Sequence, residues 1–221
     1  MTTDRTRLLV IGGGGFAREV AWLAEEISES GARIDVVGFA DDNPELQGTT
    51  LNCYPVMALE SVRQLSRPPT HYVVAIGSPS ARESLARRAE LLSIEPITLV
   101  HPTVRMSRYV EIGAGTVICA GSLLTTNIRI GAHVQINLDC TVGHDAELED
   151  FATLAPGVHV SGHVTLGRGC YLGTGCSIVN GMAGNPIRVG DRSTVGAAAC
   201  VTRTVEMGTT VVGVPARVLN K

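Results

Sequence analysis

One histidine in the chain, His144, stands directly before an acidic residue, Asp145. An imidazole titrates near neutral pH, so His144 can take a proton from an amine or a hydroxyl group under physiological conditions. A histidine on a protein surface is more often simply solvated. The chemical role of His144 therefore depends on what surrounds it.

A second set of residues could bind a phosphate. Gly12-Gly-Gly-Gly15 follows the apolar run at residues 7–11 and precedes a helical pattern, and backbone N–H groups at such a turn can approach a phosphate. Asp41 and Asp42 end the next strand, where carboxylates can accept from ribose hydroxyls or a base N–H. The full dinucleotide fingerprint is absent, because its last glycine is missing: counted from Gly13 that place is taken by Arg18, and counted from Gly12 by Ala17. A tight turn and a solvated loop remain the alternatives.

A period of six residues indicates the elements that position His144. Every sixth residue is a branched aliphatic: Ile112, Ile118, Leu124, Ile130, Ile136, Val142, Leu148, Leu154, Val160, Leu166, Leu172 and Ile178. Neither an α-helix, with a period of 3.6, nor a single strand, with a period of two, produces this spacing. The pattern breaks at residues 180–186 and resumes one residue out of phase at Val189.

The residues two positions before each aliphatic are small or β-branched, as at Thr116, Ala146 and Cys170. Such a unit predicts one short strand and one tight turn, and three units, 18 residues, close a triangular coil with the aliphatics inside. Cys140, Cys170 and Cys176 fall on inward positions, so we expect reduced cysteines that act as small apolar residues.

Residues 18 apart should lie one above another, about 4.8 Å apart. One coil after His144 is Gly162, which should leave room for an extended ligand, and one coil after Asp145 is His163, with which Asp145 should pair. His159 and His163 have a zinc-like spacing for a helix, but on this period they fall on different positions of the triangle. We therefore expect no metal site.

The first 96 residues alternate strand and helix patterns, with strands expected at 7–11, 34–40 and 71–76, a helix after the glycine run, a short helix at 59–65 and another helix from residue 81. This alternation predicts a small parallel sheet with right-handed crossovers, a Rossmann-like half-domain. The sequence thus divides into an α/β domain at 1–96 and a β-helix at 97–221.

The period of six, with the ending Val212-Gly-Val-Pro-Ala216, resembles the hexapeptide-repeat acyltransferases, whose fold is a left-handed parallel β-helix. The combination with the α/β half-domain resembles the bacterial sugar acetyltransferases that modify nucleotide-linked amino sugars, including the bacillosamine-pathway UDP-4-amino-sugar, GDP-perosamine and sialic acid acetyltransferases. The matching stretches are Gly12–Gly15, Phe39-Ala-Asp-Asp42, Ala75-Ile-Gly77 with Arg82, and Asn137 with His144-Asp145.

This resemblance implies acetyl-CoA as co-substrate, a homotrimer with active sites between subunits, and direct attack of the acceptor on the thioester. A cytoplasmic location is expected separately, because the sequence shows neither a signal-peptide pattern nor a membrane-spanning run. His144 would be the general base and Asp145 would orient it. The implied acetyl-CoA contacts are Thr153, Gly162, Thr174 and Ala197. The implied contacts to the nucleotide sugar are Gly14, Gly15, Phe16, Asp41, Asp42, Gly77 and Arg82.

Composition narrows the partners. The net charge of −3 makes nucleic acid an unsuitable partner, and no apolar run approaches the length of a membrane span. Three functions remain open: N-acetylation of a nucleotide-linked amino sugar, which the α/β half-domain favours; O-acetylation of a free sugar of the sialic acid type; and a β-helical trimer that serves as a scaffold without turnover.

Overall fold

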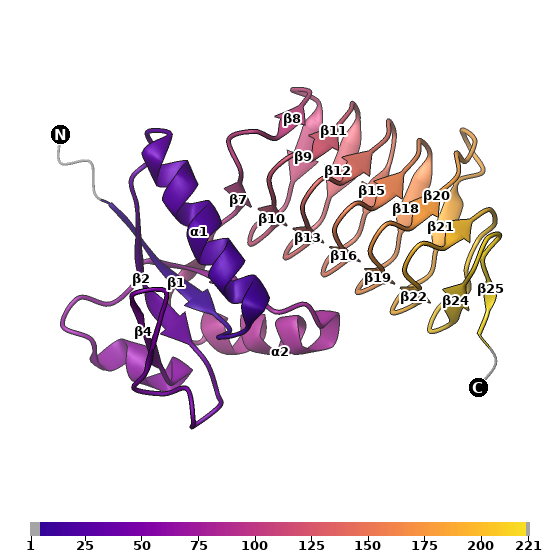
Figure 1. Cartoon of the computed structure of the whole chain (residues 1–221). Helices are drawn as coiled ribbons and strands as arrows, with labels where there is room; N and C mark the ends of the chain where they lie inside the picture. Colours follow the sequence, from indigo (N-terminus) through magenta and orange to yellow (C-terminus); the bar gives the residue numbers. More distant parts are fainter. Residues whose placement is uncertain (1–4, 220–221) are drawn as a thin grey trace. The chain divides into compact units, whose positions relative to one another are not determined.

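A computed structural model describes residues 5–219, which form two compact units divided between Pro102 and Thr103 (Figure 1). The division falls six residues after the boundary expected at 96/97. The segment from Ile97 onward belongs to the first unit because its backbone is tied there: the Ile97 N–H donates to the Tyr72 carbonyl at 2.9 Å. His101 also pairs with Glu26 of the same unit, Nε2 to Oε2 at 2.8 Å.

The first unit is built on a sheet with the order β3-β4-β2-β1-β5-β6, parallel except for the β3–β4 hairpin. Its strands are β1 (Thr6–Ile11), β2 (Ile34–Ala40), β3 (Thr50–Leu51), β4 (Tyr54–Met57), β5 (His71–Val74) and β6 (Glu95–Pro96), followed by β7 (Leu99–Val100). The other elements are α1 (Gly15–Glu29), the 3₁₀ helix η1 (Leu59–Gln64) and α2 (Pro79–Glu90).

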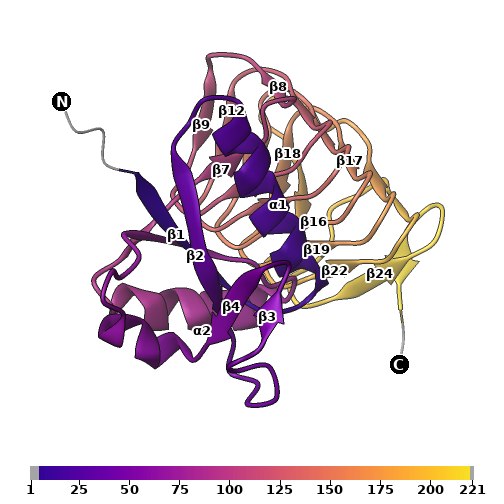
Figure 2. The ribbon, with the colours of Figure 1, turned by 60° about the vertical axis from the view of Figure 1, so that its left-hand side comes forward.

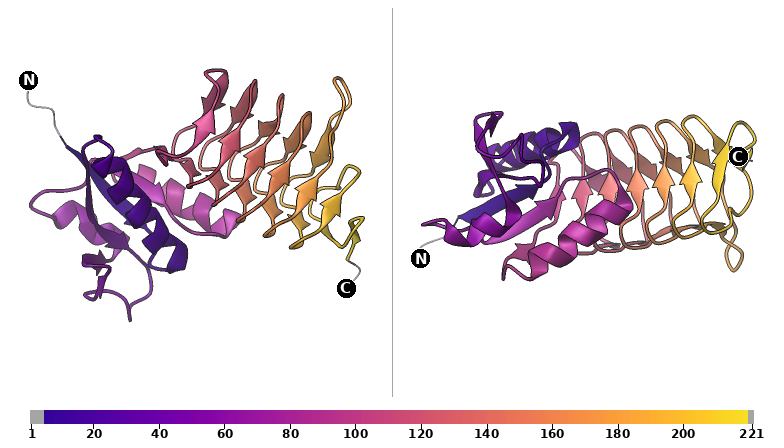
Figure 3. Two further views of the ribbon diagram at one scale, coloured as in Figure 1. Left: turned by 45° about the horizontal axis from the view of Figure 1, so that its top comes forward. Right: turned by 90° about the horizontal axis from the view of Figure 1, so that it is seen from below.

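Helix α1 packs on β1 and β2, whereas α2 packs on β5, and Figure 3 shows the two helices on opposite faces of the sheet. Strand β1 is therefore covered on both sides, which explains why its residues 8–11 are uninterrupted aliphatics with at most 1% exposure. The chain runs from β1 to β2 in one direction and reaches β5 on the other side of β1. Ligands of open α/β sheets bind at such a reversal, outside the carboxyl ends of the strands.

The second unit is a parallel β-helix whose coils stack along one axis (Figure 3). Face 1 contains β10 (Val117–Ile118), β13 (Gln135–Ile136), β16 (Thr153–Leu154), β19 (Tyr171–Leu172), β22 (Thr194–Val195) and β24 (Thr210–Val212), with β25 (Arg217–Val218) antiparallel at its end. Face 2 contains β8 (Arg105–Met106), β11 (Leu123–Leu124), β14 (Thr141–Val142), β17 (His159–Val160), β20 (Ser177–Ile178) and β23 (Cys200–Val201). Face 3 contains β9 (Val110–Ile112), β12 (Ile128–Ile130), β15 (Glu147–Leu148), β18 (Val164–Leu166) and β21 (Ile187–Val189).

The aliphatic series forms the core of this unit. From Ile118 to Ile178 its members are at most 5% exposed, and only Ile112, in the first coil, is half-buried. Cys140, Cys170 and Cys176 lie beside them as buried free thiols, and burial raises the pKa of Cys140 to about 11 and that of Cys176 to about 12. At neutral pH these thiols are protonated and act as apolar side chains, as expected.

Strand pairing confirms the 18-residue coil, because Ile118 pairs with Ile136 and Ile136 pairs with Leu154. Across the loop at 180–186 the spacing is 23, and Leu166 pairs with Val189. The loop thus adds five residues to one coil without breaking the stack. Across residues 5–219, no helix is both long enough and apolar enough to cross a membrane.

Candidate active site

His144 and Asp145 lie on the edge between faces 2 and 3, which we call the His144 edge (residues 125–127, 143–146, 161–163 and 179–186). Stacking builds two columns there. One contains Thr126, His144, Gly162 and Asn180; the other contains Asn127, Asp145 and His163. Backbone hydrogen bonds connect the coils, from Asp145 N–H to the Thr126 carbonyl at 3.1 Å and from His163 N–H to the His144 carbonyl at 3.0 Å.

The turn conformation brings His144 and Asp145 together. Asp145 has φ +57°, in the left-handed region, and so do Asn127 and His163 above and below it. Adjacent side chains point apart on a regular strand, but this turn lets the Asp145 Oδ2 reach the His144 Nδ1 at 2.7 Å. The hydrogen bond from His144 is the main reason that the pKa of Asp145 is lowered, and Asn127 adds to it. A carboxylate on Nδ1 keeps the proton on that nitrogen and leaves the Nε2 lone pair free to act as a base.

Two further side chains complete this group. Asn127 Nδ2 donates to the other carboxylate oxygen, Oδ1 of Asp145, at 3.3 Å. His163 Nε2 lies 3.8 Å from Oδ2, and its ring meets the His144 ring edge to face, with centroids 5.1 Å apart. The expected pairing of Asp145 with His163 is therefore a close approach longer than a hydrogen bond. Asn127 was not identified from the sequence, although it stands 18 residues before Asp145.

The expectation of open space over Gly162 is wrong. A Cβ built on Gly162 would lie 2.6 Å from both Cε1 and Nε2 of His144 and 2.9 Å from Oδ1 of Asn180. The glycine makes room for the catalytic candidate's own imidazole, because the ring leans over the next coil. Asn180 was also missed, although two steps of 18 from His144 lead to it. Whether Gly162 contacts acetyl-CoA stays a prediction.

The other acetyl-CoA candidates lie elsewhere on the β-helix. Thr174 and Ala197 occupy the edge between faces 1 and 2, which we call the Thr174 edge (residues 119–122, 137–140, 155–158, 173–176 and 196–199). They stack in adjacent coils, with Ala198 N–H donating to the Thr174 carbonyl at 2.9 Å. Thr153 lies within face 1, on β16, and its side chain is buried. A single chain therefore does not bring these residues to Gly162 and His144.

A groove of about 430 Å³ opens on face 3 beside Asp145. Its walls include Asn127, Asp145, Arg129 and Glu147, together with Arg108 and Tyr109 from the loop before β9. Asp145 is thus accessible from this side, and 39% of its side chain is exposed.

In the first unit, the glycine run divides into two pairs. Gly12 and Gly13 are buried. A Cβ on Gly12 would lie 2.9 Å from the Ala75 carbonyl oxygen, and one on Gly13 would lie 3.0 Å from Asp41 Oδ2, so both positions are crowded. Gly14 and Gly15 are exposed; a Cβ on Gly14 would meet nothing within 4 Å, and one on Gly15 only the far end of Arg18. Packing in this chain does not explain why this second pair is glycine.

The glycine run ends at helix α1, whose N-cap is Gly14 and whose first turn contains no acidic side chain. No side-chain oxygen caps the helix, so its first N–H groups face outward. Phe16, half-buried, follows in the first turn. An anionic group is the natural ligand at such an end.

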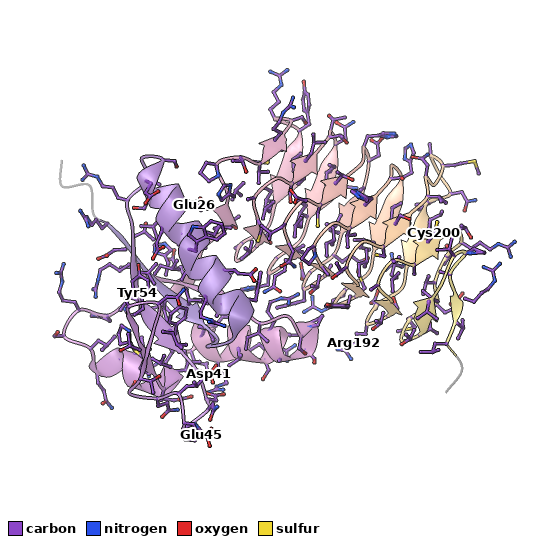
Figure 4. All side chains as sticks on the ribbon, in the orientation of Figure 1. Glu26, Asp41, Glu45, Tyr54, Arg192 and Cys200 are labelled. Atoms are coloured by element: carbon purple, nitrogen blue, oxygen red, sulfur yellow. The ribbon has the colours of Figure 1, made fainter. Side chains whose placement is uncertain are left out.

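Asp41 and Asp42 have different surroundings. Asp41 lies at the carboxyl end of β2 (Figure 4) and accepts from Gly13 N–H at 2.7 Å, so it fixes the glycine run. Asp42 points to Arg88, with oxygens at 2.5 and 3.0 Å from the guanidinium nitrogens, and this hydrogen bond lowers the pKa of Asp42. Both carboxylates remain candidates for contact with a ribose or base, although Asp42 is already paired with the guanidinium of Arg88.

Gly77 and Arg82 flank the same end of the sheet, after β5. Gly77 is exposed, and a Cβ there would meet nothing within 4 Å. Arg82 is buried, and its Nη1 donates to the Ile76 carbonyl at 2.8 Å. Arg82 therefore supports the loop that carries Gly77 from within.

Comparison with known proteins shows which family has this fold. Residues 7–89 match the family model described as the PglD N-terminal domain. The chain is 29% identical over 213 residues to the GDP-perosamine N-acetyltransferase of Escherichia coli O157:H7, covering 96% of both chains. The structure of WeeI from Acinetobacter baumannii AYE is 34% identical, covers 97% of this chain and 100% of its own, and superposes with a TM-score of 0.88.

The structure of PerB from Caulobacter crescentus, in complex with CoA and GDP-perosamine, is 26% identical and covers 96% of this chain and 97% of its own, with a TM-score of 0.84. These similarities extend over both units and confirm the predicted fold, an α/β half-domain followed by a left-handed β-helix. The chain belongs to the hexapeptide-repeat sugar N-acetyltransferases, a family of acyltransferases.

Proposed function

We propose that this protein transfers the acetyl group of acetyl-CoA to the amino group of a nucleotide-linked amino sugar. The observation that supports this most is the contact between Asp145 and Nδ1 of His144, which leaves Nε2 as a proton acceptor on an accessible edge. One relative is named a GDP-perosamine N-acetyltransferase, and another was solved in complex with CoA and GDP-perosamine.

The reaction we propose is a direct acyl transfer, in which a C–N bond forms and the C–S bond of the thioester then breaks. The neutral amine attacks the thioester carbonyl carbon while His144 Nε2 takes its proton, and the C–S bond then breaks as the imidazolium returns that proton to the leaving thiolate. A thioester is already activated, so no acyl-enzyme is required. The residues have to orient the acceptor, accept the proton and hold the charged imidazole, which the Asp145 carboxylate does through Nδ1.

The nucleotide would bind at the carboxyl ends of β1, β2 and β5. Three observations support this site: the topological reversal at β1, the exposed glycines Gly14, Gly15 and Gly77 that packing does not require, and the uncapped start of α1. Asp41 would hold the glycine run in shape for the phosphates, through its bond to the Gly13 N–H.

We also propose a homotrimer that associates through face 2. The outward residues of face 2 from the second coil on are uncharged apart from one imidazole: Leu123, Thr141, His159, Ser177 and Cys200. Face 3 is charged, with Glu111, Arg129, Glu147 and Arg188 in the matching positions, and is suited to water. Face 2 lies between the His144 edge and the Thr174 edge.

Closed three-fold association through face 2 would bring the Thr174 edge of one copy to the His144 edge of the next, and so gather the acetyl-CoA candidates that one chain keeps apart. Three chains of 23.2 kDa give about 70 kDa by sedimentation equilibrium. Ser177→Arg on face 2 should lower this mass and Glu111→Arg on face 3 should not. A wild-type mass of one or two chains would contradict the proposal. The cytoplasmic location expected from the sequence stays a prediction.

The decisive experiment compares wild type with His144→Asn, using acetyl-CoA and GDP- or UDP-linked 4-amino sugars. Asparagine is similar in size but cannot take the proton at neutral pH, so kcat should fall about 10² to 10⁴-fold while both KM values change little. Product should carry the acetyl group on nitrogen. Turnover of a free sialic acid instead would favour O-acetylation, and near wild-type kcat in His144→Asn would remove His144 from the mechanism.

A further inference from the structure

Three side chains at the His144 edge converge in a way that general-base catalysis alone does not need. The Asp145 Oδ2 lies 2.7 Å from His144 Nδ1 and 3.8 Å from His163 Nε2, and the three ligand atoms all lie within 4.8 Å of one another. Stacking produces this group: His163 is one coil beyond Asp145, and the left-handed turns aim the two side chains at the same point.

We propose that His144, Asp145 and His163 form an inhibitory binding site for a divalent transition metal such as Zn²⁺. This inference rests on the proposed role of His144. The metal ion would inhibit acetyl transfer and would not be a cofactor of the reaction.

The geometry suits this cation. Zinc–nitrogen and zinc–oxygen bonds of about 2.0–2.2 Å in a tetrahedron separate the ligand atoms by about 3.3–3.6 Å. The two distances from Oδ2, 2.7 and 3.8 Å, lie on either side of that range, so small side-chain rotations would complete the site. Two imidazoles and one carboxylate favour zinc and its neighbours over Mg²⁺ or Ca²⁺, which prefer oxygen ligands.

Access and charge point the same way. The side chains of His144, Asp145 and His163 are 50%, 39% and 26% exposed, so an ion can enter and a water can take the fourth position. Asn127 donates to the remaining oxygen of Asp145, Oδ1, and so orients the carboxylate while Oδ2 stays available. The carboxylate of Asp145 supplies negative charge to the cation, whereas the two imidazoles bind it as neutral ligands.

Binding would switch off the base by moving one proton. In the active form Nδ1 of His144 carries the hydrogen that it donates to Asp145, and Nε2 has a lone pair. When zinc bonds to Nδ1, that hydrogen is relocated through water to Nε2, and the ring remains neutral overall. Nε2 is then an N–H donor and cannot accept a proton from the acceptor amine. Zinc should therefore lower kcat.

The test uses the full-length protein in a Cys53→Ser background, because the exposed Cys53 thiol is a competing zinc ligand. Titration with Co²⁺, followed by its visible absorption, and calorimetry with Zn²⁺ should give one ion per chain. His163→Asn removes one ligand, and asparagine tolerates the left-handed conformation of this position, as Asn127 shows in the same column. This variant should weaken zinc binding at least tenfold, whereas His71→Gln, at a histidine of the other unit, should leave it unchanged.

In the acetyl-transfer assay, Zn²⁺ should lower kcat, EDTA should restore it, and Mg²⁺ should have no effect. The zinc concentration for half-inhibition, measured against each variant's own zinc-free rate, should rise at least tenfold in His163→Asn. Absence of stoichiometric binding in the wild type, or equal binding by His163→Asn, would overturn the site. Stoichiometric binding with undiminished turnover would overturn the inhibitory role. Either result leaves acetyl transfer itself, measured without metal, as a separate question.

Discussion

Gly162 offers a sharp test of how His144 is held. A Cβ at this position would lie 2.6 Å from Cε1 and Nε2 of His144, against an ordinary contact of at least 3.4 Å, so Gly162→Ala must displace the ring by about 0.8 Å (3.4 − 2.6). If the ring moves away from Asp145, the 2.7 Å hydrogen bond at Nδ1 lengthens to about 3.5 Å and is lost. The backbone at Gly162 has no left-handed φ, so the substitution acts through space alone.

A displacement near 1 Å in a catalytic group can cost about 10²-fold in rate, which corresponds to about 2.7 kcal/mol of transition-state stabilisation. We therefore expect kcat of Gly162→Ala to fall by about one to two orders of magnitude, with KM for acetyl-CoA little changed. Steady-state kinetics with both substrates varied would measure this, and circular dichroism would show that the coil is intact.

A double-mutant cycle separates this effect from a direct contact with acetyl-CoA. In a His144→Ala background the ring is absent, so adding Gly162→Ala should cost almost nothing further. If Gly162→Ala instead raises KM for acetyl-CoA at unchanged kcat, or costs the same in both backgrounds, the glycine serves the co-substrate and the packing argument is wrong.

The remaining predictions concern the rest of the molecule. Gly15→Ala should raise KM for the nucleotide sugar at least tenfold, because the methyl group would stand where the phosphates are proposed to bind. Tm should not fall, because alanine is more favourable than glycine in a helix by up to about 1 kcal/mol and its Cβ would meet no close neighbour. A lower Tm with unchanged KM would contradict the nucleotide site. Leu154→Ala should destabilise the β-helix by about 2–5 kcal/mol in denaturant unfolding, because Leu154 is fully buried, whereas Leu91→Ala, at 73% exposure, should stay within about 0.5 kcal/mol; equal effects would argue against the core. Arg88 lowers the pKa of Asp42 and of Glu60, so these two ion pairs stabilise the fold only while the carboxylates are ionised. Their contribution, at most about 1 kcal/mol for exposed pairs, is present near neutral pH and is lost as the pH falls below about 4. The difference in unfolding free energy between wild type and Arg88→Gln should therefore be larger at pH 7 than at pH 3, and the reverse order would refute the assignment.

The sequence by itself determined the β-helix, because its core repeats at a fixed spacing that no helix or single strand shares. Once the coil length is 18, stacking partners follow by arithmetic, and this arithmetic placed Gly162 beside His144 and His163 beside Asp145. It also leads from Asp145 back to Asn127 and from Gly162 on to Asn180, two neighbours that can be found from spacing alone.

In the first unit the sequence predicted the buried strands and the two longer helices, whose apolar patterns are long. It missed β3, β6 and the hairpin strand β4, since a strand of two to four residues in a polar context has no visible period. The domain boundary depended on hydrogen bonds of Ile97 and His101 to distant residues, which leave no trace in local composition.

Only the tertiary structure decided which side-chain atoms of the stacked residues are in contact. Spacing places His144 next to Gly162, but the direction of the ring, which fills the space over that glycine, depends on side-chain torsions and on the Asp145 carboxylate. The left-handed φ of Asp145 lets two adjacent side chains meet when a regular strand would separate them. The edges that bear Gly162 and Thr174 lie on opposite sides of face 2, and no reading of one chain's spacing joins them. The physical reason is that a repeat fixes which residues lie side by side, whereas torsion angles and long-range contacts fix which atoms touch.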